Sequence, residues 1–79
     1  MNIIVGAKIN HRHWKNKWVV IVAINKKGYV VRRWMRDNWG REFQTVGERE
    51  LMDKEELESH FDIEEWQQRT RKEKLKSIL

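Results

Sequence analysis

The sequence predicts a mainly β fold with a C-terminal α part, namely five short strands followed by one short and one longer helix. Three observations predict it: short β-branched runs before residue 53, the restriction of all four glycines to the first 47 residues, and two helix-capping signatures after Met52. A chain of 79 residues buries only about 60% of its unfolded surface, too little for two cores. We therefore expect a single domain, with residues 1–52 as the β part and residues 53–79 as a helical extension that packs on it or projects from it.

Short apolar runs between turn signals predict the strands. Residues 18–24, WVVIVAI, are dominated by β-branched side chains and are too few for a typical core helix. The stretch NKKG follows and leads into YVVRRWM, the pattern of a hairpin whose glycine, Gly28, takes a positive φ angle. We expect the remaining strands at residues 3–9, 42–46 and 48–52.

Two helices are predicted where the sequence becomes acidic. Asp53 with Glu56, and Asp62 with Glu65, have the spacing of an N-cap and the residue three positions after it. The first signature begins a short helix at residues 54–61, and the second begins a longer helix that runs into the seventies. Its apolar stripe is thin, so we expect its last turns to fray or to order only against a partner.

The net charge of +5 conceals three blocks of different sign. Residues 1–47 carry +8, residues 48–65 carry −7 and residues 66–79 carry +4. The basic first block suits a polyanion, whereas the acidic block repels one if both lie on the same face. Neutralisation of one block by another within the domain is the alternative.

The chain lacks the features of secreted and membrane proteins. It contains no cysteine, so it has neither a disulfide framework nor a thiolate metal site, and a reducing, cytoplasmic setting fits best. The N-terminus lacks the basic and long apolar regions of a signal peptide. The longest apolar run, seven residues, is too short to cross a bilayer. We expect a soluble protein without a membrane partner.

Three segments, VGAKI, KWVVIVAINKKGYVVRRW and FQTVGERELM, follow one another as strand, hairpin and strand. This arrangement resembles SH3-like small barrels such as KOW and Tudor modules, and the resemblance implies a five-stranded closed barrel. The chain is also similar in style to the compact proteins that phages and other mobile elements encode.

One group of enzymes with an SH3-like fold, the type II dihydrofolate reductases, uses a Gln-Ile-Tyr stretch. Gln44 matches its first residue, but Thr45 and Val46 differ, so that activity does not carry over. Walker and Rossmann glycine motifs are absent from the sequence. The paired glutamates lie in first turns of predicted helices, where negative charge favours the helix dipole. We expect neither an enzyme nor a cofactor.

Three histidines are the candidates for a metal site. His11, His13 and the distant His60 would supply imidazole ligands for zinc. The first two lack a nearby carboxylate or thiolate, so we interpret them as residues of a solvated loop and expect no metal.

Alternation along the second hairpin strand sorts its side chains into two faces. The more apolar face is assigned inward and carries Tyr29, Val31, Arg33 and Met35. Arg33 must then lie at a barrel mouth where its guanidinium reaches water. Arg32, Trp34 and Arg36 stand in a row on the outward face. Such a row suits single-stranded bases, through stacking worth about 1–3 kcal/mol per base and through phosphate contacts; an intramolecular cation–π pair is the alternative for Trp34.

Two further tryptophans, Trp14 and Trp39, lie in predicted loops, where packing explains an aromatic ring less readily. Trp18, by contrast, opens the central strand and is expected in the core. If both loops reach one rim, they form a single basic aromatic patch to which His11 and Lys17 also belong. The predicted partner-binding residues are Arg12, Trp14, Lys15, Arg32, Trp34, Arg36, Trp39 and Arg41.

The protein is thus predicted to be a small non-enzymatic binding module. A protein partner is slightly favoured, in the manner of a phage protein that docks on a host protein through the basic face or the acidic helices. The reasons are that no RRM, KH or helix-turn-helix motif is present, and that the acidic block opposes a polyanion unless it faces away. Binding of single-stranded DNA or RNA is the alternative, and assembly into a homo-oligomer through sheet edges or the Trp66 helix is the third hypothesis.

Overall fold

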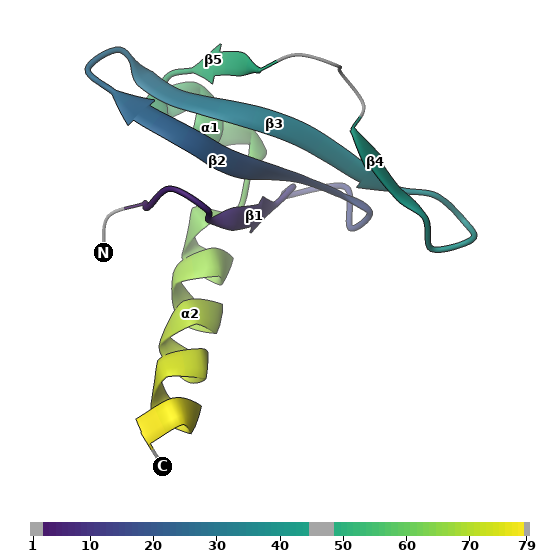
Figure 1. Cartoon of the computed structure of the whole chain (residues 1–79), viewed down its shortest axis with the longest axis vertical. Coiled ribbons are helices and arrows are strands. Elements are labelled where there is room, and N and C mark those ends of the chain that lie inside the picture. Colours follow the sequence, from purple (N-terminus) through teal and green to yellow (C-terminus); the bar gives the residue numbers. More distant parts are fainter. Residues whose placement is uncertain (1–2, 45–48, 79) are drawn as a thin grey trace.

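The computed structural model describes residues 3–44 and 49–78. These residues form a five-stranded antiparallel sheet followed by two helices, which confirms the predicted mainly β fold with a C-terminal α part (Figure 1). The elements are β1 (Lys8–Asn10), β2 (Lys17–Asn25), β3 (Gly28–Arg36), β4 (Glu42–Gln44), β5 (Glu50–Met52), α1 (Lys54–His60) and α2 (Ile63–Ile78).

The sheet is open. Its strand order is β1-β2-β3-β4, and β5 also pairs with β3. β4 pairs with the last residues of β3 and β5 with its first residues, so the two short strands share one edge. The closed barrel that we expected is not seen in the described residues.

The connection between the helices occupies the edge of β1 where a closing strand would pair. His11 and Phe61 form an isolated antiparallel bridge. Asp62 donates its backbone N–H to the Asn10 carbonyl at 2.8 Å, and Arg12 donates its own to the His60 carbonyl at 2.9 Å. These bonds protect the edge from pairing with another chain.

The predicted hairpin is confirmed, and its glycine has two reasons to be there. Asn25 Oδ1 accepts hydrogen bonds from the backbone of Lys27 at 2.9 Å and of Gly28 at 3.2 Å. Gly28 has a φ of +146°, and a Cβ atom there would lie 2.5 Å from the Met52 carbonyl oxygen. The glycine therefore serves both the turn and the close approach of β5.

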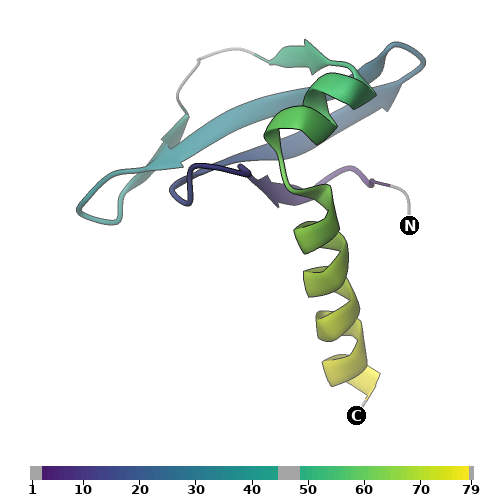
Figure 2. The ribbon, with the colours of Figure 1, turned by 180° about the vertical axis from the view of Figure 1, so that it is seen from behind.

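The core lies between the helices and one face of the sheet, which we call the inner face; the other is the outer face. Both predicted N-caps are confirmed, since Asp53 Oδ1 accepts from Glu56 N at 2.7 Å and Asp62 Oδ1 from Glu65 N at 3.0 Å. The buried core residues are Ala7, Ile9, Val19, Ile21, Val31, Met52, Leu57, Phe61, Ile63 and Trp66. Views from opposite sides show α1 behind the sheet in Figure 1 and in front of it in Figure 2, while α2 runs away beyond β1.

Arg33, which alternation assigns to the inner face, reaches water from an open sheet and not from the barrel mouth that we expected. Its side chain is 39% exposed, and it donates to Glu50 from Nε at 2.7 Å and from Nη2 at 3.1 Å. Alternation is interrupted in β2, where the register shifts between Ile21 and Ala23.

Element boundaries differ from the predicted ones at the chain's ends. β1 has three residues rather than the seven of the predicted strand 3–9, because residues before it form a turn in which Ala7 N–H bonds the Ile4 carbonyl at 3.2 Å. The predicted strands 42–46 and 48–52 extend into residues 45–48, which lie outside the described residues. α2 continues past Arg71 to Ile78. Within the described ranges, neither helix has the length and apolarity to cross a membrane.

Candidate functional site

A row of cross-strand partners crosses the outer face of the sheet. The register pairs Asn10 with Trp18, Trp18 with Trp34, and Trp34 with Gln44. Direct partners in an antiparallel ladder have Cβ atoms about 4.5–5.5 Å apart. Trp18 and Trp34 are therefore direct cross-strand neighbours at the centre of four strands.

Cations lie in the rows on either side. Lys8 and Arg32 both pair with Val20 on one side, and Arg36 follows Trp34 on the other. Arg36 is bound to Glu42 at 2.9 Å, whereas Arg32 has no ion-pair partner among the described residues. We call the set Lys8, Trp18, Arg32, Trp34 and Arg36 the basic aromatic face.

Trp18 is buried, as expected, and lies on the outer face. Only 5% of it is exposed, and it is not part of the core cluster. Lys8 Nζ lies 4.4 Å and Arg36 Cζ 5.5 Å from its ring centroid, so two cationic side chains cover it. The cation–π pair considered for Trp34 thus forms at Trp18. Trp34 remains partly exposed and is the accessible ring of the pair.

The loops that carry Trp14 and Trp39 lie at the same end of the sheet (Figures 1 and 2). Asn16 and Arg36 join them, because Arg36 N–H donates to the Asn16 carbonyl at 2.8 Å and Asn16 Nδ2 donates to the Arg36 carbonyl at 3.1 Å. Trp14 is 57% and Trp39 79% exposed. The two loops that carry these exposed rings thus share one rim of the sheet.

One side-chain acceptor organises each loop. Asp37 Oδ1 accepts from the backbone N–H of Trp39 and of Arg41, both at 2.9 Å. In the other loop, His11 Nδ1 accepts from His13 N at 3.1 Å and from Trp14 N at 3.3 Å. The exposed tryptophans are therefore displayed by hydrogen-bonded turns.

Each exposed ring also has a cation over it. Lys17 Nζ lies 5.1 Å from the Trp14 centroid, and Arg41 Cζ lies 5.7 Å from that of Trp39. Arg41 also pairs with Asp37 at 3.1 Å, and its side chain is 75% exposed. Lys15 is exposed in the Trp14 loop.

The pKa of His11 is lowered. Partial burial is the largest cause, and the positive charges of His13, His60, Lys17 and Arg33 add to it. A neutral imidazole leaves Nδ1 free to accept its two backbone hydrogen bonds at neutral pH. In the described part of the chain, no three histidine or carboxylate side chains are placed to hold a metal ion together.

Arg12, one of the predicted site residues, contacts the end of α1 instead. Its Nε donates to the Glu58 carbonyl at 2.7 Å, in the last turn of α1. This bond satisfies a helix-end carbonyl that has no partner within the helix. Arg12 therefore points to the helices and not to the basic aromatic face.

The acidic residues of the first helix face away from the basic aromatic face. α1 packs on the inner face through Leu57, and its exposed carboxylates are those of Glu55, Glu56 and Glu58. The sheet therefore separates these carboxylates from Lys8, Arg32 and Arg36.

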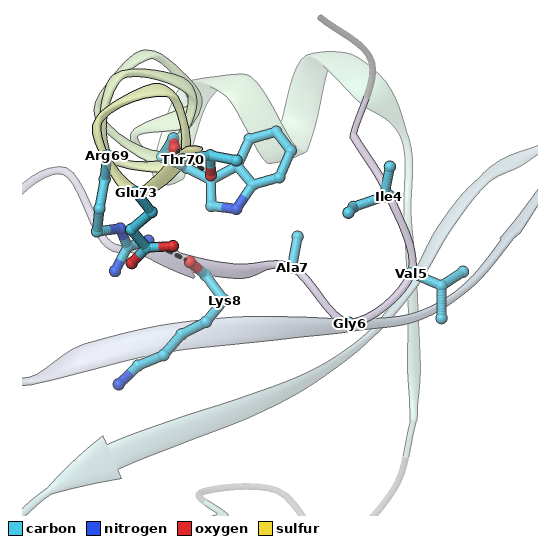
Figure 3. A pocket seen from close by; sticks show the side chains of 9 residues that line it. Ile4, Val5, Gly6, Ala7, Lys8, Arg69, Thr70 and Glu73 are labelled. Atoms are coloured by element: carbon cyan, nitrogen blue, oxygen red, sulfur yellow. Dashed lines mark hydrogen bonds between the residues drawn. The ribbon is translucent and has the colours of Figure 1, made fainter. Parts of the chain in front are cut away.

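A hollow lies between the N-terminal segment and α2 (Figure 3). It measures about 420 Å³, and Ile4, Ala7 and Trp66 supply much of its apolar lining. Arg69 crosses it to bond the Lys8 carbonyl. A smaller pocket of about 130 Å³ lies beside the tryptophan loops.

Sequence reasoning missed Lys8 and Gln44 as members of the outer face. Alternation with the buried Ala7 and Ile9 would have placed Lys8 outward. Gln44 becomes a neighbour of Trp34 only through the β3–β4 register, which a single strand's pattern does not contain. No family model matches the chain, and comparisons with curated proteins and with solved structures find no match.

Proposed function

We propose that the protein is a small non-enzymatic module that binds single-stranded nucleic acid across the basic aromatic face and the adjoining tryptophan loops. The observation that carries this proposal is the indole pair of Trp18 and Trp34, flanked by three cations on the sheet face that the helices leave uncovered. Sheets with exposed aromatic rings bind unpaired bases by stacking, and basic groups hold the backbone.

Aromatic rings and cations have complementary roles in the proposed binding surface. Trp34, Trp14 and Trp39 offer rings to successive bases, each contact contributing about 1–3 kcal/mol. Arg32 supplies a cation without an ion-pair partner among the described residues, and Lys15 a second exposed one. Stacking of this kind is tolerant of sequence and predicts binding that weakens steeply with salt.

Repulsion of a polyanion by the acidic block is one of the two reasons that favour a protein partner. The α1 carboxylates of this block lie on the other side of the sheet from the basic aromatic face, so they do not oppose a polyanion there. A cytoplasmic location suits this function. Kinship with SH3-like modules and a phage-type origin stay predictions.

A protein partner remains the second candidate because of a separate feature. Leu51 in β5 and Phe43 in β4 are exposed apolar residues on the short strands that end the sheet. Exposed sheet edges invite pairing with another chain, either a host protein or a second copy.

Fluorescence anisotropy of a labelled single-stranded oligonucleotide at several salt concentrations tests the proposal. Arg32→Gln should weaken binding several-fold and reduce the salt dependence by about one released ion. Lys27→Gln is the matched control, because it removes the same charge from the β2–β3 turn. This turn lies at the end of the sheet opposite the tryptophan loops (Figure 1). Trp34→Leu should cost about tenfold in affinity through lost stacking. Absence of salt-dependent binding by the unmodified protein contradicts the proposal.

A further inference from the structure

A small pocket opens beside the tryptophan loops. Its volume is about 130 Å³, and it is lined by His11, Trp14, Lys17, Trp18, Arg33, Trp34 and Phe61. A pocket of this volume has room for a phosphate group.

Three nitrogen donors line this pocket. Lys17 forms no ion pair among the described residues, and its Nζ is held near the Trp14 ring. Arg33 uses Nε and Nη2 for Glu50, which leaves Nη1 as a donor. His11 accepts hydrogen bonds at Nδ1, so its neutral ring carries its proton on Nε2.

The pocket has a positive potential. Among the described residues, the lining contains no aspartate or glutamate, and the carboxylate of Glu50 is engaged by Arg33. The pKa of His11 is lowered by burial first, then by the charges of His13 and His60, and then by those of Lys17 and Arg33. Aromatic walls exclude water and strengthen the attraction for an anion.

We infer that this pocket binds a phosphomonoester, the terminal phosphate of a nucleic-acid strand, between Lys17, Arg33 and His11, with Trp14 stacked on the adjacent base. The inference rests on the proposed function, since the strand end would come from a chain bound at the same rim. A terminal phosphate carries up to two negative charges, whereas a phosphate within the chain carries one, so the cations of the pocket favour the end of a chain.

The test compares three otherwise identical oligonucleotides with a 5′-phosphate, a 3′-phosphate or no terminal phosphate. One phosphorylated form should bind about tenfold more tightly than the unphosphorylated one. Lys17→Gln should abolish that preference. Lys15 lies two residues before Lys17, in the loop that leads into β2, and does not line the pocket. Lys15→Gln removes the same charge and should weaken all three alike and preserve the ratio.

Inorganic phosphate provides a second readout on the unmodified protein. Saturable changes in the His11 side-chain NMR signals, lost in Lys17→Gln, support the pocket as a phosphate site. Equal affinities for the three oligonucleotides together with silent signals overturn the inference, while salt-dependent binding of all three still supports the proposed function. If phosphate shifts these signals but no oligonucleotide binds, the site takes a free phosphate compound and the proposed function fails.

Discussion

Trp39 donates its backbone N–H to Asp37 Oδ1 at 2.9 Å while its side chain is 79% exposed. The same oxygen accepts from Arg41 N, so the most exposed ring among the described tryptophans projects from a fixed turn. A ring held in place loses less entropy when it stacks on a ligand.

Asp37→Ala should release the Trp39 turn. Two backbone donors lose their acceptor, which should cost about 1 kcal/mol of unfolding free energy and speed amide hydrogen exchange at Trp39 and Arg41. Asp37→Asn keeps the Oδ1 acceptor and should retain slow exchange. The ion pair that it loses contributes little, because the Arg41 side chain is 75% exposed. Equal exchange rates in Asp37→Ala and the unmodified protein would show that the turn does not depend on Asp37.

The His11 interaction predicts a pH-dependent stability. The folded pKa of His11 lies below its ordinary value of 6.5, mainly through burial, so the unfolded chain binds a proton more readily. Neutral His11 therefore contributes fully to the free energy of unfolding above pH 6.5. This contribution is lost as the pH falls below 6.5 toward the lowered pKa of the folded state.

Urea denaturation of His11→Gln and the unmodified protein at pH 7.5 and 5 measures this dependence. The unmodified protein should lose more stability on acidification than the variant does. Identical losses would exclude His11 as the titrating group.

Substitution of Trp18 should mainly lower stability, whereas substitution of Trp34 should mainly weaken binding. Trp18→Ala should cost about 3 kcal/mol of unfolding free energy, since it removes a buried aromatic ring. Trp34→Ala should cost less, because Trp34 is partly exposed, yet it should weaken nucleic-acid binding more than any change in stability explains. Denaturation and anisotropy on both variants provide the comparison, and the reverse order of stability losses would contradict the assigned burial.

Gly28→Ala should be markedly destabilising. The new methyl group would meet the Met52 carbonyl oxygen at 2.5 Å in a backbone conformation with φ of +146°, for a cost of about 2–3 kcal/mol. Gly6→Ala is the control, because φ there is also positive, at +91°, but nothing lies within 4 Å; it should cost about 1 kcal/mol. Equal losses in thermal denaturation would show that the contact with β5 does not contribute.

Local signals predicted the parts of the fold that local interactions build. The NKKG turn and the two aspartate N-caps depend on residues within three positions of each other, so the sequence contains them directly. Closure of the sheet is different, because it depends on which distant segment pairs with β1. The α1–α2 connection takes that edge through His60 and Asp62, a choice that no periodic pattern encodes.

The candidate site could also be predicted only in part, because some of its contacts join segments that are distant in the sequence. Alternation in β3 correctly placed Arg32, Trp34 and Arg36 together on the outer face. Trp18 begins a run that is apolar throughout and contains an irregularity near Val22, so alternation did not assign it a face. Arg12 has the composition of a binding residue, but its contact with the Glu58 carbonyl forms only in the folded chain.

An amide and indole NMR titration with a short single-stranded oligonucleotide tests the central claim most directly. If nucleic acid binds across the basic aromatic face, salt-sensitive shifts should occur at Trp34, at Arg32 and at the indole N–H groups of Trp14 and Trp39. The signals of Leu57 in α1 should not change. Shifts confined to α1 and α2, or none at all, would contradict this claim.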